Sequence, residues 1–211
     1  MMSRSRPTID VSACLLDPEQ HPGPRPLCWA TVFGTDHPVE LEVGSGKGLF
    51  LASAASQKPA HNYLGIELSR KYARLAAERV VRLGVSNVRV WPGDARAVLA
   101  RLVPDASVRA VHVYFPDPWW KKRHKKRRVF TAALLASVVR VLEPGGELHV
   151  ATDVEEYFDV IRTLVAAELR LVELTVPPCK EPEHDLDYLT NFERKFRIEG
   201  RTIHRALYKM T

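Results

Sequence analysis

Hydrophobic and polar residues along the chain follow two different periods in turn. From Val39 onward, short segments with the period of a β-strand are separated by longer segments with the period of an α-helix. This alternation predicts an α/β fold with a parallel, doubly wound sheet that is closed by a final pair of strands. The predicted strands cover residues 39–43, 62–68, 87–91, 108–115, 147–152, 169–174 and 202–209, and the predicted helices cover 49–56, 70–84, 95–103, 130–143 and 154–169.

The helix predicted at residues 70–84 has the clearest amphipathic pattern. Its apolar stripe should be the buried face, and Gly84 stands where a C-cap is expected. The stripe consists of Tyr72, Ala76, Val80 and Leu83. Pro144-Gly145-Gly146 should end the helix at 130–143. Asp153 and Glu156 have the capping-box spacing for the start of the helix at 154–169.

The first 38 residues lack this alternation. They contain Pro7, Pro18, Pro22, Pro24 and Pro26, which fix φ, remove backbone donors and discourage both helix and central strand. The pattern therefore predicts an irregular, partly mobile arm at residues 1–38 and a single domain at 39–211. We expect Leu27, Trp29 and Phe33 of the arm to pack onto the domain.

Composition adds one strong feature, a concentrated positive charge. The 211 residues carry a formal net charge of +6, and residues 121–128 read KKRHKKRR. This basic segment holds seven of the 31 Lys and Arg residues, so the whole positive excess lies in it. Such a segment indicates a local anionic partner rather than a generally cationic protein.

The apolar runs and the cysteines indicate which classes of protein are excluded. No apolar run approaches the ~20 residues that span a bilayer, and no apolar segment follows the charged N-terminus, so we expect neither a membrane span nor a secretory signal. The three cysteines are far apart and form no CxxC pair. This pattern predicts no disulfide framework and no metal site, and it fits a reducing cytoplasm.

A glycine-rich turn follows the first predicted strand. Gly44, Gly46 and Gly48 let the chain turn sharply and let a ligand lie against bare backbone, next to the free N–H groups of the following helix. Glu67 ends the second strand, where a carboxylate can accept both hydroxyl groups of a ribose. An ordinary tight turn is the alternative, but the position of Glu67 favours a nucleotide-type pocket.

The residues around this turn favour one cofactor. A dinucleotide site would have glycine where Leu49 stands, and a pyrophosphate would be repelled by Glu42. A carboxylate at Glu42 suits an ammonium or sulfonium group, and S-adenosylmethionine carries both together with a ribose and an adenine. Asp94, after the third strand, could accept from the adenine amino group, cap the next helix, or do both.

A Pro-Asp-Pro turn follows the fourth strand, next to the point where open α/β sheets bind ligands. The two prolines restrict the backbone around Asp117, which makes the turn a stiff mount for a carboxylate. The basic segment follows at once, and its cations can bind phosphates while aromatic rings stack on unpaired bases. A rigid surface turn with Trp119 or Trp120 as core filler is the alternative, but a nucleic-acid substrate accounts for the basic segment as well.

Together these motifs resemble those of the bacterial single-chain tRNA (guanine-N7)-methyltransferases, over residues 39–209. LEVGSGKG resembles the cofactor loop of the family, GIELSRKY its ribose-binding strand end, and FPDPWWKKRHKKRR its catalytic and RNA-contact segment. TNFERKF at residues 190–196 resembles its C-terminal substrate motif. The sequence departs from the family at Trp120, where proline is common, and this leaves the shape of the substrate mouth open.

The resemblance implies a class I S-adenosylmethionine-dependent methyltransferase with a seven-stranded, mostly parallel sheet and an antiparallel last strand. The implied reaction is methyl transfer to N7 of a guanine in the variable loop of tRNA. We expect a cytoplasmic protein, a monomer or homodimer, without an obligatory protein partner. The candidate cofactor contacts are Glu42, Gly44, Gly46, Gly48, Glu67, Asp94 and Asp117, and Asp117 is also the candidate catalytic residue. The resemblance places substrate contacts at Lys121, Asp153, Thr190, Asn191, Phe192 and Glu193, and RNA contacts at Arg123, His124, Lys125, Lys126, Arg127 and Arg128.

Several alternatives stay open. Asp153 could be only a helix cap, and Phe192 only a core aromatic. FPDPWW also loosely resembles the Asp-Pro-Pro-aromatic turn of enzymes that methylate adenine amino groups. A nucleic-acid-binding module with a decayed pocket is a third possibility, although the intact glycine turn, Glu67 and Asp117 argue against it.

Overall fold

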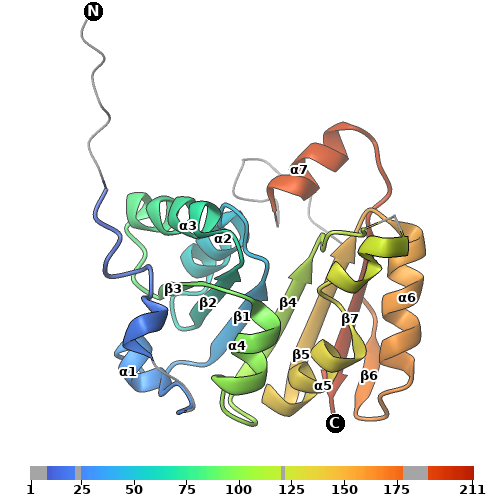
Figure 1. Cartoon of the computed structure of the whole chain (residues 1–211), viewed down its shortest axis with the longest axis horizontal. Coiled ribbons are helices and arrows are strands. Elements are labelled where there is room, and N and C mark those ends of the chain that lie inside the picture. The colour runs from blue at the N-terminus through green and yellow to red at the C-terminus, as the bar shows by residue number, and fades with distance from the viewer. Residues whose placement is uncertain (1–8, 22–24, 120–121, 178–189) are drawn as a thin grey trace, which may run out of the picture.

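The computed structural model describes residues 9–21, 25–119, 122–177 and 190–211. Seven strands form one sheet in the order β3-β2-β1-β4-β5-β7-β6 (Figure 1). Strands β1 to β5 are parallel, whereas β7 runs antiparallel between β5 and β6, so the predicted sheet is confirmed. The strands are β1 Val39–Val43, β2 Asn62–Glu67, β3 Val88–Pro92, β4 Val108–Tyr114, β5 Leu142–Thr152, β6 Leu171–Leu174 and β7 His204–Met210.

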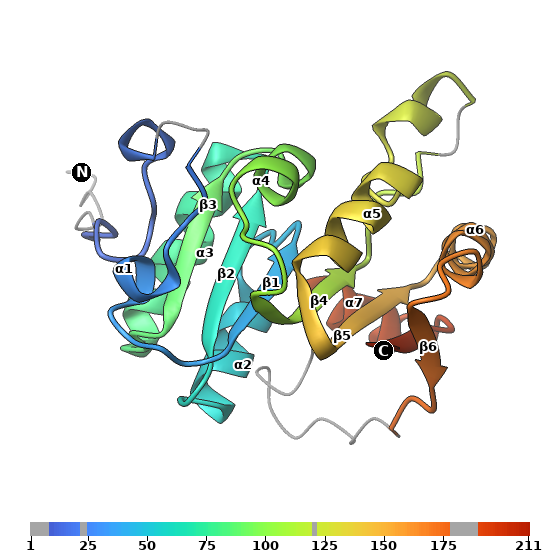
Figure 2. The same ribbon diagram turned by 90° about the horizontal axis from the view of Figure 1, so that it is seen from below.

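The helices cover the two faces of the sheet in separate groups. Helices α4, α5 and α6 lie on one face, and α2 and α3 lie on the other (Figure 2). Strand order reverses direction between β1 and β4, so the loops after these two strands meet at the carboxyl edge of the sheet. The helices are α1 Trp29–Phe33, α2 Leu49–Gln57, α3 Arg70–Leu83, α4 Ala95–Arg101, α5 Ala132–Val141, α6 Glu155–Ala166 and α7 Asn191–Ile198, with short 3₁₀ helices η1 at Pro18–Gln20 and η2 at Lys122–Arg127.

Helix α3 is rotated relative to the predicted stripe. Its buried face is Ala73, Ala76, Ala77 and Val80, and it ends at Gly84 as predicted. Tyr72 and Leu83 are each 43 % exposed, so their assignment to the buried stripe was wrong. Small alanine side chains allow a closer approach to the neighbouring α2 than a tyrosine would, and the larger residues therefore stay at the flanks.

The chain between α5 and α6 differs from the prediction in two ways. Strand β5 already begins at Leu142 and runs through Pro144-Gly145-Gly146, with a register shift opposite β4. Gly145 adopts φ +79°, which lets the strand bend and pair on both sides of the irregularity. Asp153 does not cap α6, because the N-cap is Val154 and Val154 N–H donates to Thr152 Oγ1.

The N-terminal arm is more ordered in its second half than predicted. Helix α1 forms at Trp29–Phe33, in a region expected to be irregular, and Gly34 ends it in the left-handed conformation. Leu27 and Phe33 are buried against the domain. The indole of Trp29 donates to Ser107 O at 3.1 Å. The predicted packing of these three residues is confirmed, whereas the division of the chain at residue 38 stays a prediction. Within the described ranges no helix is long and apolar enough to cross a membrane.

Candidate active site

The glycine-rich turn lies between β1 and α2, at the carboxyl edge of the sheet. Gly44 adopts φ +79°, a left-handed conformation that side chains with a Cβ rarely take. Gly48 adopts φ +71°, and a Cβ at this position would lie 2.8 Å from the Cβ of Ala76 in α3. The turn therefore needs glycine both for its backbone and for the contact between α2 and α3. Gly46 also adopts a left-handed conformation, and its N–H donates to the carboxylate of Glu67 at the end of β2.

Glu67 stands at the end of β2, directly beside this turn. Its carboxylate accepts hydrogen bonds from Gly46 N–H at 2.8 Å and from Ser69 N–H at 2.8 Å. The side chain thus fixes the glycine turn to the start of α3. A carboxylate has about four lone-pair sites, so both oxygens can accept further bonds from ribose hydroxyls.

Glu42 is the most unusual acid of the site. It is 2 % exposed, and its Oε2 atom has no hydrogen-bond partner among the described residues. The hydroxyl of Ser45, in the same turn, is also buried without a partner in the described part of the chain. Burial, and then the charge of Glu67, raise the pKa of Glu42 well above its usual range. An unpartnered buried carboxyl group beside a bare-backbone turn fits a ligand that carries positive charge.

Asp94 follows β3 at the same edge and caps α4. Its carboxylate accepts from Arg96 N–H at 2.9 Å and pairs with the Arg96 guanidinium at 2.7 Å. The hydrogen bond with the Arg96 side chain lowers the pKa of Asp94. The interpretation as a helix cap is confirmed, and a contact with an adenine amino group stays a prediction.

The Pro-Asp-Pro turn is held in a strained backbone conformation. Phe115 and Trp119 have φ of 49° and 44°, values that bulky L-residues seldom adopt. Phe115 N–H donates to Ala151 O at 2.7 Å, which ties the start of the turn to β5. Between these two residues Asp117 is exposed. Strain of this kind persists where the surroundings over-determine the backbone, and it is frequent at functional sites.

The basic segment folds back beside this turn through η2. Arg127 lies over the ring of Trp119 at 5.1 Å, and the ring of His124 meets Trp119 edge-on at 5.7 Å. Arg123 is exposed and donates to His124 Nε2 at 3.3 Å. The predicted contacts at Lys121, and at the side chains of Lys125 and Lys126, fall outside the described residues, as does Trp120.

Helix α7 brings the C-terminal motif to the same region, above the carboxyl ends of the central strands (Figure 1). Thr190 caps the helix, because its hydroxyl accepts from Glu193 N–H at 3.0 Å. Glu193 is 2 % exposed and forms ion pairs with Arg197 at 2.9 Å and Arg205 at 2.7 Å. This helix was not predicted from the sequence, and neither were the arginines that hold Glu193.

Phe192 of α7 is 54 % exposed, so its interpretation as a core aromatic was wrong. Its ring lies 5.9 Å from that of Phe196 and 6.4 Å from that of Phe115. Asn191 is exposed next to it. Phe115 thus connects the Pro-Asp-Pro turn with the exposed face of α7. Asp153 lies behind this region, in an ion pair with Arg201 at 2.5 Å.

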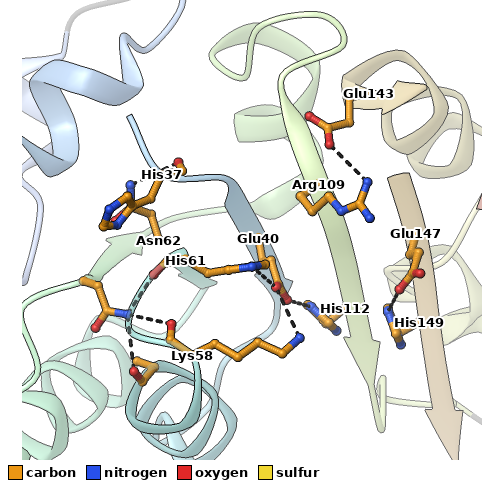
Figure 3. Close-up of polar contacts among 12 residues, drawn as sticks. His37, Glu40, Lys58, His61, Asn62, Arg109, His112, Glu143, Glu147 and His149 are labelled. Atoms are coloured by element: carbon orange, nitrogen blue, oxygen red, sulfur yellow. Dashed lines mark hydrogen bonds and ion pairs between the residues drawn. The ribbon is translucent and has the colours of Figure 1, made fainter. Parts of the chain in front are cut away.

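A second polar cluster, missed in the sequence, lies on the sheet face that carries α2 (Figure 3). The Glu40 side chain is 5 % exposed and contacts His112 at 2.7 Å, His61 at 2.7 Å and Lys58 at 3.8 Å. His149 stacks on His112 at 4.6 Å. Glu40, Lys58, His112 and His149 line a cavity of about 480 Å³. Burial alone would raise the pKa of Glu40, but the contacts with His112, Lys58 and His61 outweigh it and lower the pKa to about 2.

Comparison with known proteins identifies the family. A family model described as "Putative methyltransferase" matches residues 36–206. A tRNA (guanine-N(7)-)-methyltransferase of Rhodopirellula baltica is 41 % identical over 214 residues, covering 99 % of this chain and 78 % of that protein. The protein of the same name from Geobacter metallireducens is 35 % identical and covers 88 % of each chain.

The chain belongs to the tRNA (guanine-N(7)-)-methyltransferase family. Solved structures agree with the fold that this family membership implies. The 16S rRNA methyltransferase KamB superposes with a TM-score of 0.57 at 18 % identity, covering 87 % of this chain and 91 % of that one. A Streptococcus mutans putative methyltransferase solved in complex with SAH superposes with a TM-score of 0.53 at 11 % identity, covering 83 % and 89 %.

The sheet topology explains why the four predicted acids lie at one edge. Each stands near the end of a different parallel strand: Glu42 is the second-to-last residue of β1, Glu67 ends β2, and Asp94 and Asp117 follow β3 and β4. These acids are far apart along the chain, but the strand order places the carboxyl ends of β1 to β4 next to one another. Among the described residues no group of His, Cys, Asp and Glu is arranged to hold a metal ion.

Proposed function

We propose that this protein transfers a methyl group from S-adenosylmethionine to N7 of a guanine in tRNA and thereby forms 7-methylguanosine. The observation that carries the proposal is the buried carboxyl group of Glu42, whose Oε2 atom has no hydrogen-bond partner in the described ranges and which lies beside the left-handed glycine turn. It fits the positive charge of this cofactor better than it fits a phosphate. The names of the relatives support guanine N7 as the acceptor, and the basic segment supports an RNA substrate.

The cofactor would lie along the carboxyl edge of the sheet. Glu42 would face its positive charge, Glu67 its ribose hydroxyls and Asp94 its adenine amino group, while the glycine turn would offer bare backbone. When bound, S-adenosylmethionine supplies an electrophilic methyl group on a sulfonium sulfur. The protein must then hold this group in line with the acceptor and exclude water from it.

Guanine N7 needs little help from the protein to act as a nucleophile. It carries a lone pair on the major-groove edge of the base and loses no proton before it attacks. A strong general base is therefore unnecessary, and positioning and electrostatics should supply most of the rate. Positive charge moves onto the purine during transfer. Asp117, exposed at the mouth, would stabilise this charge or accept from the N1/N2 edge of the base.

Helix α7 would complete the acceptor side. The exposed ring of Phe192 can stack on the base, with Thr190, Asn191 and Glu193 beside it. We place the target guanine in the variable loop, where a base that is not held in a regular helix can enter the site. The exposed arginines of the basic segment, Arg123 and Arg127, would bind the phosphates of the tRNA. We further propose that the protein works in the cytoplasm as a monomer or homodimer without an obligatory protein partner.

The test is methylation of unmodified tRNA with labelled S-adenosylmethionine, followed by digestion and identification of the modified nucleoside. We expect labelled 7-methylguanosine from the variable loop. N6-methyladenosine would instead support the adenine enzyme that FPDPWW resembles. Tight tRNA binding without cofactor binding in a titration would indicate a non-catalytic RNA-binding module.

A further inference from the structure

The last residue of the basic segment is placed differently from the arginines before it. The Arg128 side chain is half-buried, and its Nε–H donates to Pro118 O at 2.7 Å. Its guanidinium lies over the ring of Tyr157, 4.5 Å from the centroid. Arg123 and Arg127 are both exposed. Arg128 therefore faces the protein, where its contacts are with the Pro-Asp-Pro turn and with the ring beneath it.

The surface beneath Arg128 is rigid. Tyr157 is fully buried at the start of α6, and its hydroxyl accepts from Phe130 N–H at 3.3 Å. Burial raises the pKa of Tyr157, while the charge of Arg128 lowers it and the charge of Asp117 raises it. Both charges thus lie close to the same ring. Arg128 is held from below by this ring and in turn holds the residue that directly follows Asp117.

The hydrogen bond from Arg128 to Pro118 O compensates for the missing backbone donors of the Pro-Asp-Pro turn. Pro116 and Pro118 have no N–H, so the turn around Asp117 has few backbone donors with which to fix itself. The Pro118 carbonyl is the acceptor that Arg128 reaches, and a charge-assisted bond to it is stronger than a neutral one. The strained φ values of Phe115 and Trp119 show that the turn is constrained from both ends.

We infer that Arg128 is a positioning residue, which holds the Pro118 carbonyl and so the orientation of Asp117, and that it does not bind RNA phosphate. The inference rests on the proposed function, because it assigns Arg128 a place in that reaction. It divides the basic segment into two parts. The exposed arginines, Arg123 and Arg127, bind the tRNA, and Arg128 joins that surface to the catalytic turn.

The test compares Arg128→Met with Arg123→Met, which remove the same charge and donors from a half-buried and an exposed site. Methyl transfer to tRNA is measured as kcat and KM over a series of salt concentrations. We expect Arg128→Met to lower kcat by about ten- to a hundred-fold, since small misplacements of a reacting group have effects of this size. Its salt slope should equal that of the wild type. Arg123→Met should act on KM and flatten the slope by about 0.7–0.9. The inference would be wrong if both variants flattened the salt dependence equally and Arg128→Met had the kcat of the wild type.

A double substitution separates positioning from general loss of structure. In an Asp117→Asn background, Arg128→Met should lower kcat less than about two-fold, because Arg128 acts through Asp117. Losses that multiply would contradict the assignment. Arg128→Lys keeps one donor and should restore part of kcat. All variants are assayed well below their measured Tm.

One readout does not depend on the activity. Hydrogen exchange at the amide of Phe115, which donates to Ala151 O at the start of the turn, should be faster in Arg128→Met than in Arg123→Met. An unchanged exchange rate would show that Arg128 does not hold the turn, and this conclusion would apply even to an inactive protein. If the wild-type protein transferred no methyl group to guanine in tRNA, the proposed function would be wrong. The hydrogen-exchange result would still show whether Arg128 holds the turn.

Discussion

The Glu40 cluster gives a stability prediction whose size follows from the structure. Glu40→Gln keeps the shape of the side chain but removes the charge that His112, His61 and Lys58 face. In the folded protein the pKa of Glu40 is about 2, against an ordinary value of 4.5. At about 1.4 kcal/mol for each pKa unit, the charged form stabilises the fold by about 3 kcal/mol at neutral pH. The loss of a hydrogen-bond partner by a buried polar group generally costs about 1–3 kcal/mol, and more where a charged group is involved, which is of the same magnitude.

The dependence on pH has a definite sign. Because the folded-state pKa is depressed, the stabilisation is complete above the unfolded-state pKa of 4.5 and is lost as the pH falls from there toward 2. Glu40→Gln resembles the protonated form at every pH. The difference in stability between wild type and variant should therefore be largest at neutral pH and shrink by roughly 1 kcal/mol at pH 4.

Urea unfolding followed by circular dichroism at pH 7.5 and pH 4 measures this difference in free energy. In thermal unfolding at pH 7.5 the Tm of the variant should be lower by roughly 6–12 °C. Glu147→Gln is the matched control, since Glu147 lies in the same cavity but pairs with His149 and is one-third exposed. It should cost less than about 1 kcal/mol. A loss below about 1 kcal/mol in Glu40→Gln, or one that grows on acidification, would refute the reasoning.

Three further predictions concern the active site. Asp117→Asn should lower kcat about a hundred-fold and leave cofactor affinity within a few-fold, as measured by methyl transfer and by titration; turnover equal to the wild type would remove Asp117 from the mechanism. Burial and the charge of Glu67 raise the pKa of Glu42, and a cationic ligand favours its carboxylate form and so lowers that pKa. Cofactor binding should therefore release a proton and tighten as pH rises, which calorimetry in buffers of different ionisation enthalpy can measure; proton uptake would contradict this. Gly48→Ala should lower stability by about 1–3 kcal/mol through the contact with Ala76 and the positive φ, and more than Gly44→Ala, whose Cβ would meet open space. Equal melting temperatures for these two variants would show that the contact is unimportant.

The sequence was a good guide to elements with a regular period. Strands β1 to β4 have the two-residue period or the apolar character of a buried strand, and they lie within one or two residues of their predicted bounds. The four predicted acids lie at one edge of the sheet, because each stands at or near a strand end and parallel strands bring such ends together, whereas their contact with a cofactor stays a prediction. Local pattern and topology were sufficient for these predictions.

Features that depend on contacts between distant residues were not predictable in this way. Helix α7 is short and mostly polar, and it is held by Thr190 and by the packing of Phe196 on Phe115. Asp153 has a capping-box spacing, yet it pairs with Arg201 from a later part of the chain. Such an ion pair competes with the local cap and wins because the partner is charged. No local period carries this information.

The two acids of β1 lie on the same face of the strand, yet their different neighbours give the two carboxyl groups different roles. Glu40 and Glu42 are two residues apart, so both point to the same side of the sheet. Around Glu40 the neighbouring elements supply imidazole and ammonium groups, and its pKa falls; the charge that acts on Glu42 is that of another acid, Glu67, and its pKa rises. The first acid is therefore ionised and fully used in holding the sheet together. The second is destabilised as an anion until positive charge arrives from outside. We propose that the carboxyl group of Glu42, whose Oε2 atom has no hydrogen-bond partner among the described residues, receives this charge from a cationic ligand beside the glycine turn.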